Sequence, residues 1–100
     1  MIKHIVMWKL KDFAEGAERA VNAAKMKTML DGCATLVPGM LKFEVALAQP
    51  GFEATYDVVL YSEFDSKASL AAYADHPTHA AVKPFIGAVR ASRQCMDYLV

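Results

Sequence analysis

Apolar residues alternate with polar ones, or run almost without interruption, in four segments of the chain. Such spacing is typical of β-strands, because successive side chains of a strand point to opposite faces. Turn-forming residues at Pro38–Gly39 and at 49–52 separate the second of these segments from its neighbours. We place the predicted strands at residues 2–10, 41–48, 55–64 and 91–100.

A long helix is predicted between the first two strands, where apolar residues recur three or four positions apart. Asp12 and Glu15 have the spacing of a capping box and predict its first turn. The helix should end near Ala34. Its inward face would hold Ala20, Ala23, Met26, Leu30 and Cys33.

A second helix follows the third strand and is predicted to break near its end. Asp65 or Ser66 can cap its start, and it should reach about Tyr73. His76 precedes a proline and is therefore pushed out of the helical region, whereas Pro77 suits the first position of a new helical turn. We expect the helix to stop and restart here.

The order strand, helix, strand, strand, helix, strand predicts an α+β fold of the ferredoxin-like βαββαβ type. The first and third strands are apolar on both faces, since Val6 and Trp8 oppose Ile5 and Met7, and Leu60 is flanked by apolar neighbours. They belong in the centre of the sheet. Two helices cover only one face, so we expect a second copy of the chain on the other, with Trp8 filling the sheet interface or stacking on a ligand. The alternative is a monomer with an unusually apolar surface.

Composition narrows the function classes. The chain has 100 residues, 55% of them hydrophobic and 22% charged, with a formal net charge of zero. This fits one domain over residues 1–100 and gives no sign of nucleic-acid or membrane binding. The first apolar segment lacks a signal-peptide pattern, so we expect a cytoplasmic protein. Cys33 and Cys95 have no metal-site spacing, and we expect both to be reduced and buried.

The richest chemistry lies in the pattern Tyr-x-x-His-Pro-x-His, which begins at Tyr73 and ends at His79. Strand parity puts His4 on one face with Val6 and Trp8, and strict alternation in the fourth strand would let Asp97 meet it. A neutral histidine can abstract a proton near neutral pH, especially where a carboxylate fixes its tautomer. No glycine-rich phosphate loop or other cofactor motif is present.

The segments HIVMWKLK, PGMLKFEVA, YADHPTH and DYLV resemble the stress-responsive A/B barrel domain family over nearly the whole chain. The resemblance implies a dimeric α+β barrel, in which two four-stranded sheets face each other around a cavity. Most members of this family have no assigned reaction. The expected partners are a second copy of the chain and a small apolar or carbonyl-containing ligand.

A plant branch of polyketide cyclases is similar to this sequence at the same residues. That resemblance implies that His79 is a catalytic base and that Tyr73 holds the substrate oxygen. The matching first-helix segment AAKMKTML departs from those cyclases, because it lacks the aromatic residues that shape their pocket. The remaining candidates for a cavity or ligand-binding role are His4, Val6, Trp8, Leu60, His76 and Asp97.

Three functions stay open from the sequence: a small-molecule-binding barrel without catalysis, a cofactor-free cyclase-like or isomerase-like enzyme, and an assembly module. For His79 the alternative role is a hydrogen bond to the backbone, for His76 a helix cap, and for His4 a structural pair with Asp97. A metal site built from the three histidines is a weak alternative, since zinc sites need three or four well-placed ligands. We therefore expect neither a metal nor a cofactor.

Overall fold

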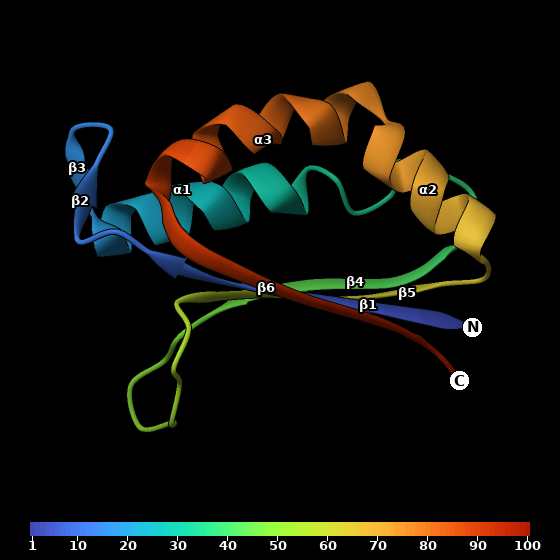
Figure 1. The fold of residues 1–100 in the computed structure, drawn as a ribbon, viewed down its shortest axis with the longest axis horizontal. Coiled ribbons are helices and arrows are strands. Elements are labelled where there is room, and N and C mark those ends of the chain that lie inside the picture. Colours follow the sequence, from blue (N-terminus) through green and yellow to red (C-terminus); the bar gives the residue numbers. More distant parts are fainter.

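The computed structural model describes all 100 residues and has two layers (Figure 1). Helices lie against one face of a four-stranded antiparallel sheet, and no helix covers the other face. The predicted α+β, ferredoxin-like order is confirmed. The strands of the sheet are β1 (Ile2–Leu10), β4 (Met40–Leu47), β5 (Val58–Phe64) and β6 (Arg90–Leu99), and the helices are α1 (Arg19–Asp31), α2 (Lys67–Asp75) and α3 (Pro77–Val89).

The sheet has the order β4-β5-β1-β6, so the two doubly apolar strands lie in its centre, as predicted. The register places Val6 opposite Leu60 on one side and Cys95 on the other. His4 in the same way lies between Ser62 and Asp97. This register decides which side chains can meet on each face.

The prediction that the first helix begins at Asp12 is wrong. Residues 13–18 form a short hairpin of β2 (Phe13–Ala14) and β3 (Ala17–Glu18), and α1 begins only at Arg19. Glu15 and Gly16 have φ angles of 51° and 75°, and two successive positive φ values produce a tight hairpin turn rather than a capping box. The predicted inward residues of the helix are buried except Ala20, which is exposed.

The second predicted strand also needs one correction, at Leu41. The register of β4 against β5 shifts between Met40 and Lys42, which leaves Leu41 with 58% of its surface exposed. The apolar face of this strand therefore begins at Met40, which lies opposite Phe64, and continues at Phe43, whose ring lies 5.9 Å from that of Tyr73, centroid to centroid.

The predicted break between the two later helices is confirmed. Ser66 caps α2 by accepting a hydrogen bond from the Ser69 backbone N–H. His76 is extended, with ψ at 136°, and Pro77 occupies the first turn of α3. The two helices therefore join through a single non-helical residue, and the chain changes direction without a loop.

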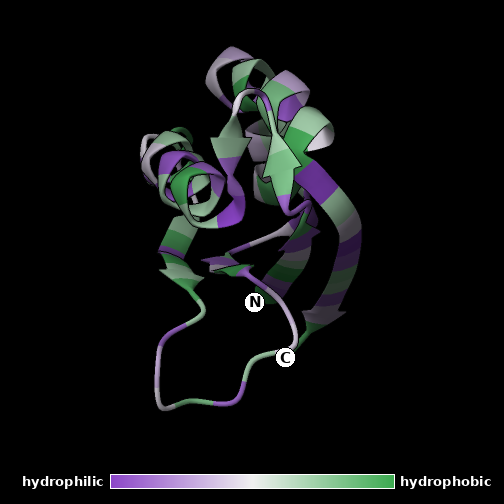
Figure 2. Ribbon diagram, turned by 90° about the vertical axis from the view of Figure 1, so that its left-hand side faces the viewer, coloured by the Kyte–Doolittle hydropathy of each residue, from purple (hydrophilic) through white to green (hydrophobic).

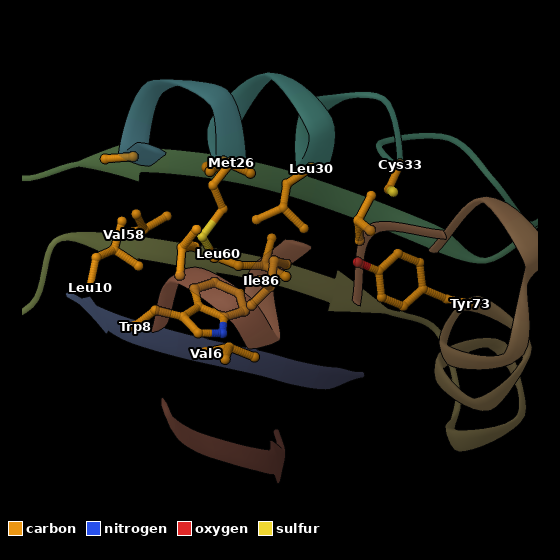
Figure 3. Packing of buried hydrophobic residues seen from close by; sticks show 14 of the residues in the cluster. Val6, Trp8, Leu10, Met26, Leu30, Cys33, Val58, Leu60, Tyr73 and Ile86 are labelled. Atoms are coloured by element: carbon orange, nitrogen blue, oxygen red, sulfur yellow. The ribbon is translucent and has the colours of Figure 1, made fainter. Parts of the chain in front are cut away.

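The core fills the layer between the helices and the sheet (Figure 3). Val6, Trp8 and Leu60 point into it from the central strands, and Met26 and Leu30 meet them from α1. Trp8 is only 4% exposed. The prediction that Trp8 fills an interface between two sheets is wrong, because the even-numbered side chains of β1 face the helices.

The opposite face of the sheet, which we call the open face, carries the alternate residues of the same strands. It is centred on Ile5, Met7, Val59, Tyr61 and Met96, which are partly or fully exposed. Beside this face, the connection between β4 and β5 extends away from the helices (Figures 1 and 2). None of the helices combines the length and the apolar character needed to span a membrane.

Candidate functional site

Four of the predicted side chains form one cluster on the helix-covered side of the sheet. Tyr73 comes from the last turns of α2 and His79 from the first turn of α3, and the break at His76 brings their rings to a centroid distance of 4.5 Å. The ring of His4 lies 6.5 Å from that of Tyr73. Asp97 completes the cluster from β6. These residues do meet, but beneath the helices rather than between two facing sheets.

His4 and Asp97 form a direct pair across the two neighbouring strands. Nδ1 of His4 lies 2.5 Å from a carboxylate oxygen of Asp97, and the two side chains are 13% and 44% exposed. Because a carboxylate oxygen accepts the hydrogen bond, the Nδ1–H of His4 is the donor and Asp97 the acceptor. The hydrogen bond fixes the orientation of the His4 ring, and Nε2 takes no part in it.

His79 is held by the backbone of the preceding helix. Its Nδ1 lies 3.0 Å from the carbonyl oxygen of Ala74, and since a carbonyl only accepts, Nδ1 is the donor. Nε2 of the neutral ring is then left with its lone pair. Burial lowers the pKa of His79 below its ordinary value, and the positive charges of Lys83 and Arg93 act in the same direction. His79 is therefore neutral at pH 7 and can accept a proton.

Tyr73 brings a buried hydroxyl without a hydrogen-bond partner into the interior. The side chain is 1% exposed, and its oxygen points from α2 into the layer between helices and sheet (Figure 3). Burial raises the pKa of Tyr73, so the hydroxyl stays protonated and remains a donor. The indole N–H of Trp8 is a second buried donor with no partner. Each such group costs roughly 1–3 kcal/mol when left unsatisfied, which favours a bound oxygen atom nearby.

A groove of about 390 Å³ reaches this cluster from the surface between α3 and β6. Trp8 and His79 line it together with apolar residues of α3, and so do three cationic side chains, Lys83, Arg90 and Arg93. Two larger hollows, of about 620 and 730 Å³, contain none of the histidines and not Tyr73. Of these three hollows, only the groove is lined by a member of the cluster, His79.

The other predicted site residues have structural positions. Val6 and Leu60, each 2% exposed, are packed in the core under the helices. His76 accepts a hydrogen bond at Nδ1 from the Thr78 backbone N–H and so caps α3, the alternative role considered for it. The prediction that Cys95 is buried is wrong, because it lies on the edge strand β6 and is exposed.

One cluster of side chains could hold a metal ion. The ligand atoms of His4, Cys95 and Asp97 lie within 4.8 Å of one another. Burial and the charge of Asp97 raise the pKa of the Cys95 thiol, so the neutral thiol must lose its proton before it can bind a metal. The histidine triple considered from the sequence does not form such a group, because His76 is turned to its own helix N-terminus.

The cationic residues of the groove were missed by the sequence reasoning. Lys83 lies four positions after His79 on α3, so helical spacing places both on one face, and this signal was readable. Arg93 lies opposite Trp8 in the sheet register, which depends on a pairing between the two ends of the chain. No local pattern in the sequence predicts that contact.

The layered fold with one helix-free sheet face defines a ferredoxin-like α+β protein. The chain belongs to the stress-responsive A/B barrel domain family, whose profile matches residues 2–100. Among curated proteins, none matches this chain.

Solved structures of similar proteins agree with this assignment. A dimeric ferredoxin-like protein of unknown function from Bacteroides fragilis is 34% identical, with a TM-score of 0.82 over 99% of this chain and 95% of that one. A second dimeric ferredoxin-like protein of unknown function, from Jannaschia sp. CCS1, is 27% identical, with a TM-score of 0.74 and coverage of 99% and 98%. A putative antibiotic biosynthesis monooxygenase from Nitrosomonas europaea is 16% identical, with a TM-score of 0.75 and coverage of 100% and 98%, and shares the fold alone.

Proposed function

We propose that this chain is a homodimer that binds a small carbonyl compound on the helix-covered side of each sheet and acts on it by cofactor-free proton transfer. The observation that carries the proposal is the proximity of a proton acceptor on His79 and a hydrogen-bond donor on Tyr73. His79 has a free Nε2 and a lowered pKa, and Tyr73, whose ring is 4.5 Å away, keeps a buried hydroxyl without a partner.

In the proposed reaction, Nε2 of His79 removes a proton from the carbon next to a carbonyl group. The electrons of the broken C–H bond move into the carbonyl, and the hydroxyl of Tyr73 donates a hydrogen bond to the oxygen on which negative charge develops. Where a conjugated double bond extends the enolate, it takes the proton back from His79 at another carbon. Otherwise its carbon attacks a second carbonyl of the same molecule, and the oxygen of that carbonyl takes the proton from His79. Both outcomes are internally balanced and need no oxidant.

His4 and Asp97 act as positioning residues in this proposal. The His4 ring packs edge-on against Phe64 and Tyr73, with centroid distances of 6.3 and 6.5 Å. Its hydrogen bond to Asp97 fixes the ring from the sheet side. Tyr73 is thereby held between two histidines, one on the sheet and one on α3.

Access to Tyr73 depends on Trp8 in this proposal. Trp8 lines the groove and also belongs to the core, whereas Tyr73 does not line the groove. A shift of the indole ring would join the groove to the interior that holds the tyrosine hydroxyl.

The homodimer is supported by the open face of the sheet. Its apolar centre at Ile5, Met7, Val59, Tyr61 and Met96 has no cover within the chain. Covering such a face is worth roughly 25 cal/mol for each Å² of apolar surface removed from water. The relatives from B. fragilis and Jannaschia are dimeric.

The second candidate function is ligand binding without catalysis. It is favoured by the near-complete burial of Tyr73, which is 1% exposed in the closed layer. The two candidates differ in one measurable property, since only the enzyme accelerates the exchange of carbon-bound protons of its ligand with solvent.

The deciding experiment follows the protein-dependent part of this exchange by proton NMR in D₂O, with a panel of β-dicarbonyl compounds whose exchange rate in buffer alone is subtracted. His79→Gln should slow the exchange by about two to four orders of magnitude, because it removes the base. Tyr73→Phe should slow it less. His76→Asn is the matched control, since asparagine also caps a helix and His76 takes no part in the reaction. An unchanged protein-dependent rate in a folded His79→Gln protein rules out the mechanism, and a wild type that exchanges no compound faster than buffer alone favours binding without catalysis.

A further inference from the structure

The geometry points to an anion subsite in the groove between α3 and β6, where Lys83, Arg90 and Arg93 bind the carboxylate of an oxo acid whose carbonyl group reaches His79. This inference rests on the proposed function for the role of His79, and it adds the chemical class of the ligand. The three cations line one groove, and no acidic residue lines it with them.

The positive charge of the groove is not neutralised within the chain. The chain as a whole has 11 basic and 11 acidic residues, so an excess of one sign at one place is a local feature. The ion pairs of the protein join His4 to Asp97, Arg19 to Asp12 and Lys27 to Asp31. None of them involves Lys83, Arg90 or Arg93. Their charges are left for an external anion.

The three cations come from elements that fix them around His79. Lys83 lies one turn after His79 on α3, and Arg93 lies beside Trp8 on β6. Arg90 stands at the junction of α3 and β6, where its backbone N–H bonds to the Ile86 carbonyl. Lys83 and Arg93 are both close enough to His79 to lower its pKa. An anion bound by them therefore lies near the proposed base.

A carboxylate fits this arrangement better than a neutral group would. Two arginines offer planar forks of N–H donors that match the two oxygens of a carboxylate, and Lys83 adds a point charge. The apolar wall formed by Trp8, Val82 and Ile86 suits a short hydrocarbon chain between the carboxylate and the carbonyl. The volume of about 390 Å³ lies in the range of small-molecule pockets, toward its lower end.

Anion binding would also raise the pKa of the proposed base, His79. His4, Arg93, Lys83 and the Tyr73 ring face His79 from β1, β6, α3 and α2, and besides burial, the charges of Lys83 and Arg93 lower the pKa of His79. A bound carboxylate offsets part of this charge. The pKa of His79 should then rise toward its ordinary value, which makes the ring a stronger base only when the ligand is present.

The test titrates the full-length protein with levulinate, which carries a carboxylate and a ketone, and follows the ring signals of His79 by NMR at fixed ionic strength. Levulinate should bind and raise the pKa of His79. Lys83→Gln and Arg93→Gln should each weaken binding by about twofold to fivefold, because each removes a charge-assisted contact at an exposed residue. Lys67→Gln is the matched control, since this lysine begins α2 and does not line the groove, and it should bind like the wild type.

Two further probes separate the possible outcomes. Methyl levulinate, which has the ketone but no charge, should bind at least about tenfold more weakly than levulinate. Equal binding of the ester, or undiminished levulinate binding in both groove variants, would overturn the inference. Inorganic phosphate that binds more tightly than levulinate would overturn the choice of a carboxylate. Levulinate that binds as expected but shows no His79-dependent proton exchange would leave the anion subsite standing and contradict the proposed reaction alone.

Discussion

The two faces of the sheet are built from the same strands and yet differ in almost every physical respect. On β1, Val6 and Trp8 are sealed beneath the helices, whereas Ile5 and Met7 stay partly exposed on the open face. The covered face also holds the polar groups that need explanation, namely the histidine cluster and the unpartnered Tyr73 hydroxyl.

On the open face, the charged side chains lie around an aromatic ring instead of in a groove. Lys3 and Lys42 lie 5.8 and 5.6 Å from the centre of the Tyr61 ring, and the Tyr61 hydroxyl donates to Glu63. These groups surround an apolar centre in the way that a polar rim surrounds an interface. The contrast suggests a division of roles, with ligand chemistry on the covered face and assembly on the open face.

The largest effect that we expect comes from Trp8→Ala on the covered face. Truncation of a buried aromatic residue typically costs about 3–5 kcal/mol in the free energy of unfolding. The loss should lie at the lower end of that range, because it also removes an unpartnered N–H. Urea unfolding measures it.

The neighbouring variant Met7→Ala makes this measurement a comparison of the two faces. Its loss in the free energy of unfolding should depend on protein concentration, since Met7 would be covered only in the dimer. The loss caused by Trp8→Ala should not depend on protein concentration. A Trp8→Ala deficit below about 1 kcal/mol would contradict the burial of the indole ring.

The second prediction concerns a substitution that disrupts the proposed dimer interface on the open face alone. Met7→Glu places a charge at the centre of the apolar patch, between Val59 and Gln94 of the adjacent strands. Burying that charge without a partner should raise the dimer dissociation constant at least about a hundredfold while the monomer stays folded. Analytical ultracentrifugation and circular dichroism report on the two properties. Lys42→Gln at the rim is the control and should change little, and a Met7→Glu protein that dimerises normally would refute the proposed interface.

The third prediction concerns the buried polar groups of the covered face. Tyr73→Phe removes a hydroxyl that has no partner in the free protein, so it should stabilise the fold by about 1 kcal/mol, in contrast to most core substitutions. The same change should weaken binding of carbonyl ligands. Thermal unfolding without and with ligand tests both parts. Destabilisation of the free protein would mean that the hydroxyl already has a partner, such as a buried water.

The sequence predicted the elements of this fold well because their signals are local and periodic. The break at His76 and Pro77 follows from proline sterics, and the central positions of the two doubly apolar strands follow from their composition. The turn at Glu15 and Gly16 could not be read in this way, because a glutamate with positive φ is rare and the same residues also fit a capping box.

The faces of the sheet were harder to assign for a related reason. A strand that is apolar on both sides carries no information on which side meets the helices, and Trp8 was therefore placed at the wrong surface. The candidate cluster was predictable as a set of residues, since Tyr73 and His79 share one short segment. The groove was not, because Arg93 reaches Trp8 only through the pairing of β1 with β6.

The smallest effect that we expect is a pH dependence that belongs to the covered face. The pKa of His79 is lower in the folded protein than the value of about 6.5 for an unfolded chain. Between these two values the unfolded state binds more protons, so the stability contributed by the neutral ring is present above pH 6.5 and is lost as the pH falls toward the folded pKa. His79→Gln should flatten the dependence of the free energy of unfolding on pH, measured by urea unfolding between pH 7 and pH 5.

His76→Asn is the control. It should leave the slope of stability against pH unchanged, because His79, the group that titrates on the covered face, is still present. A slope that survives unchanged in His79→Gln would show that another group carries the acid sensitivity, and the contrast between the two faces would lose its electrostatic part.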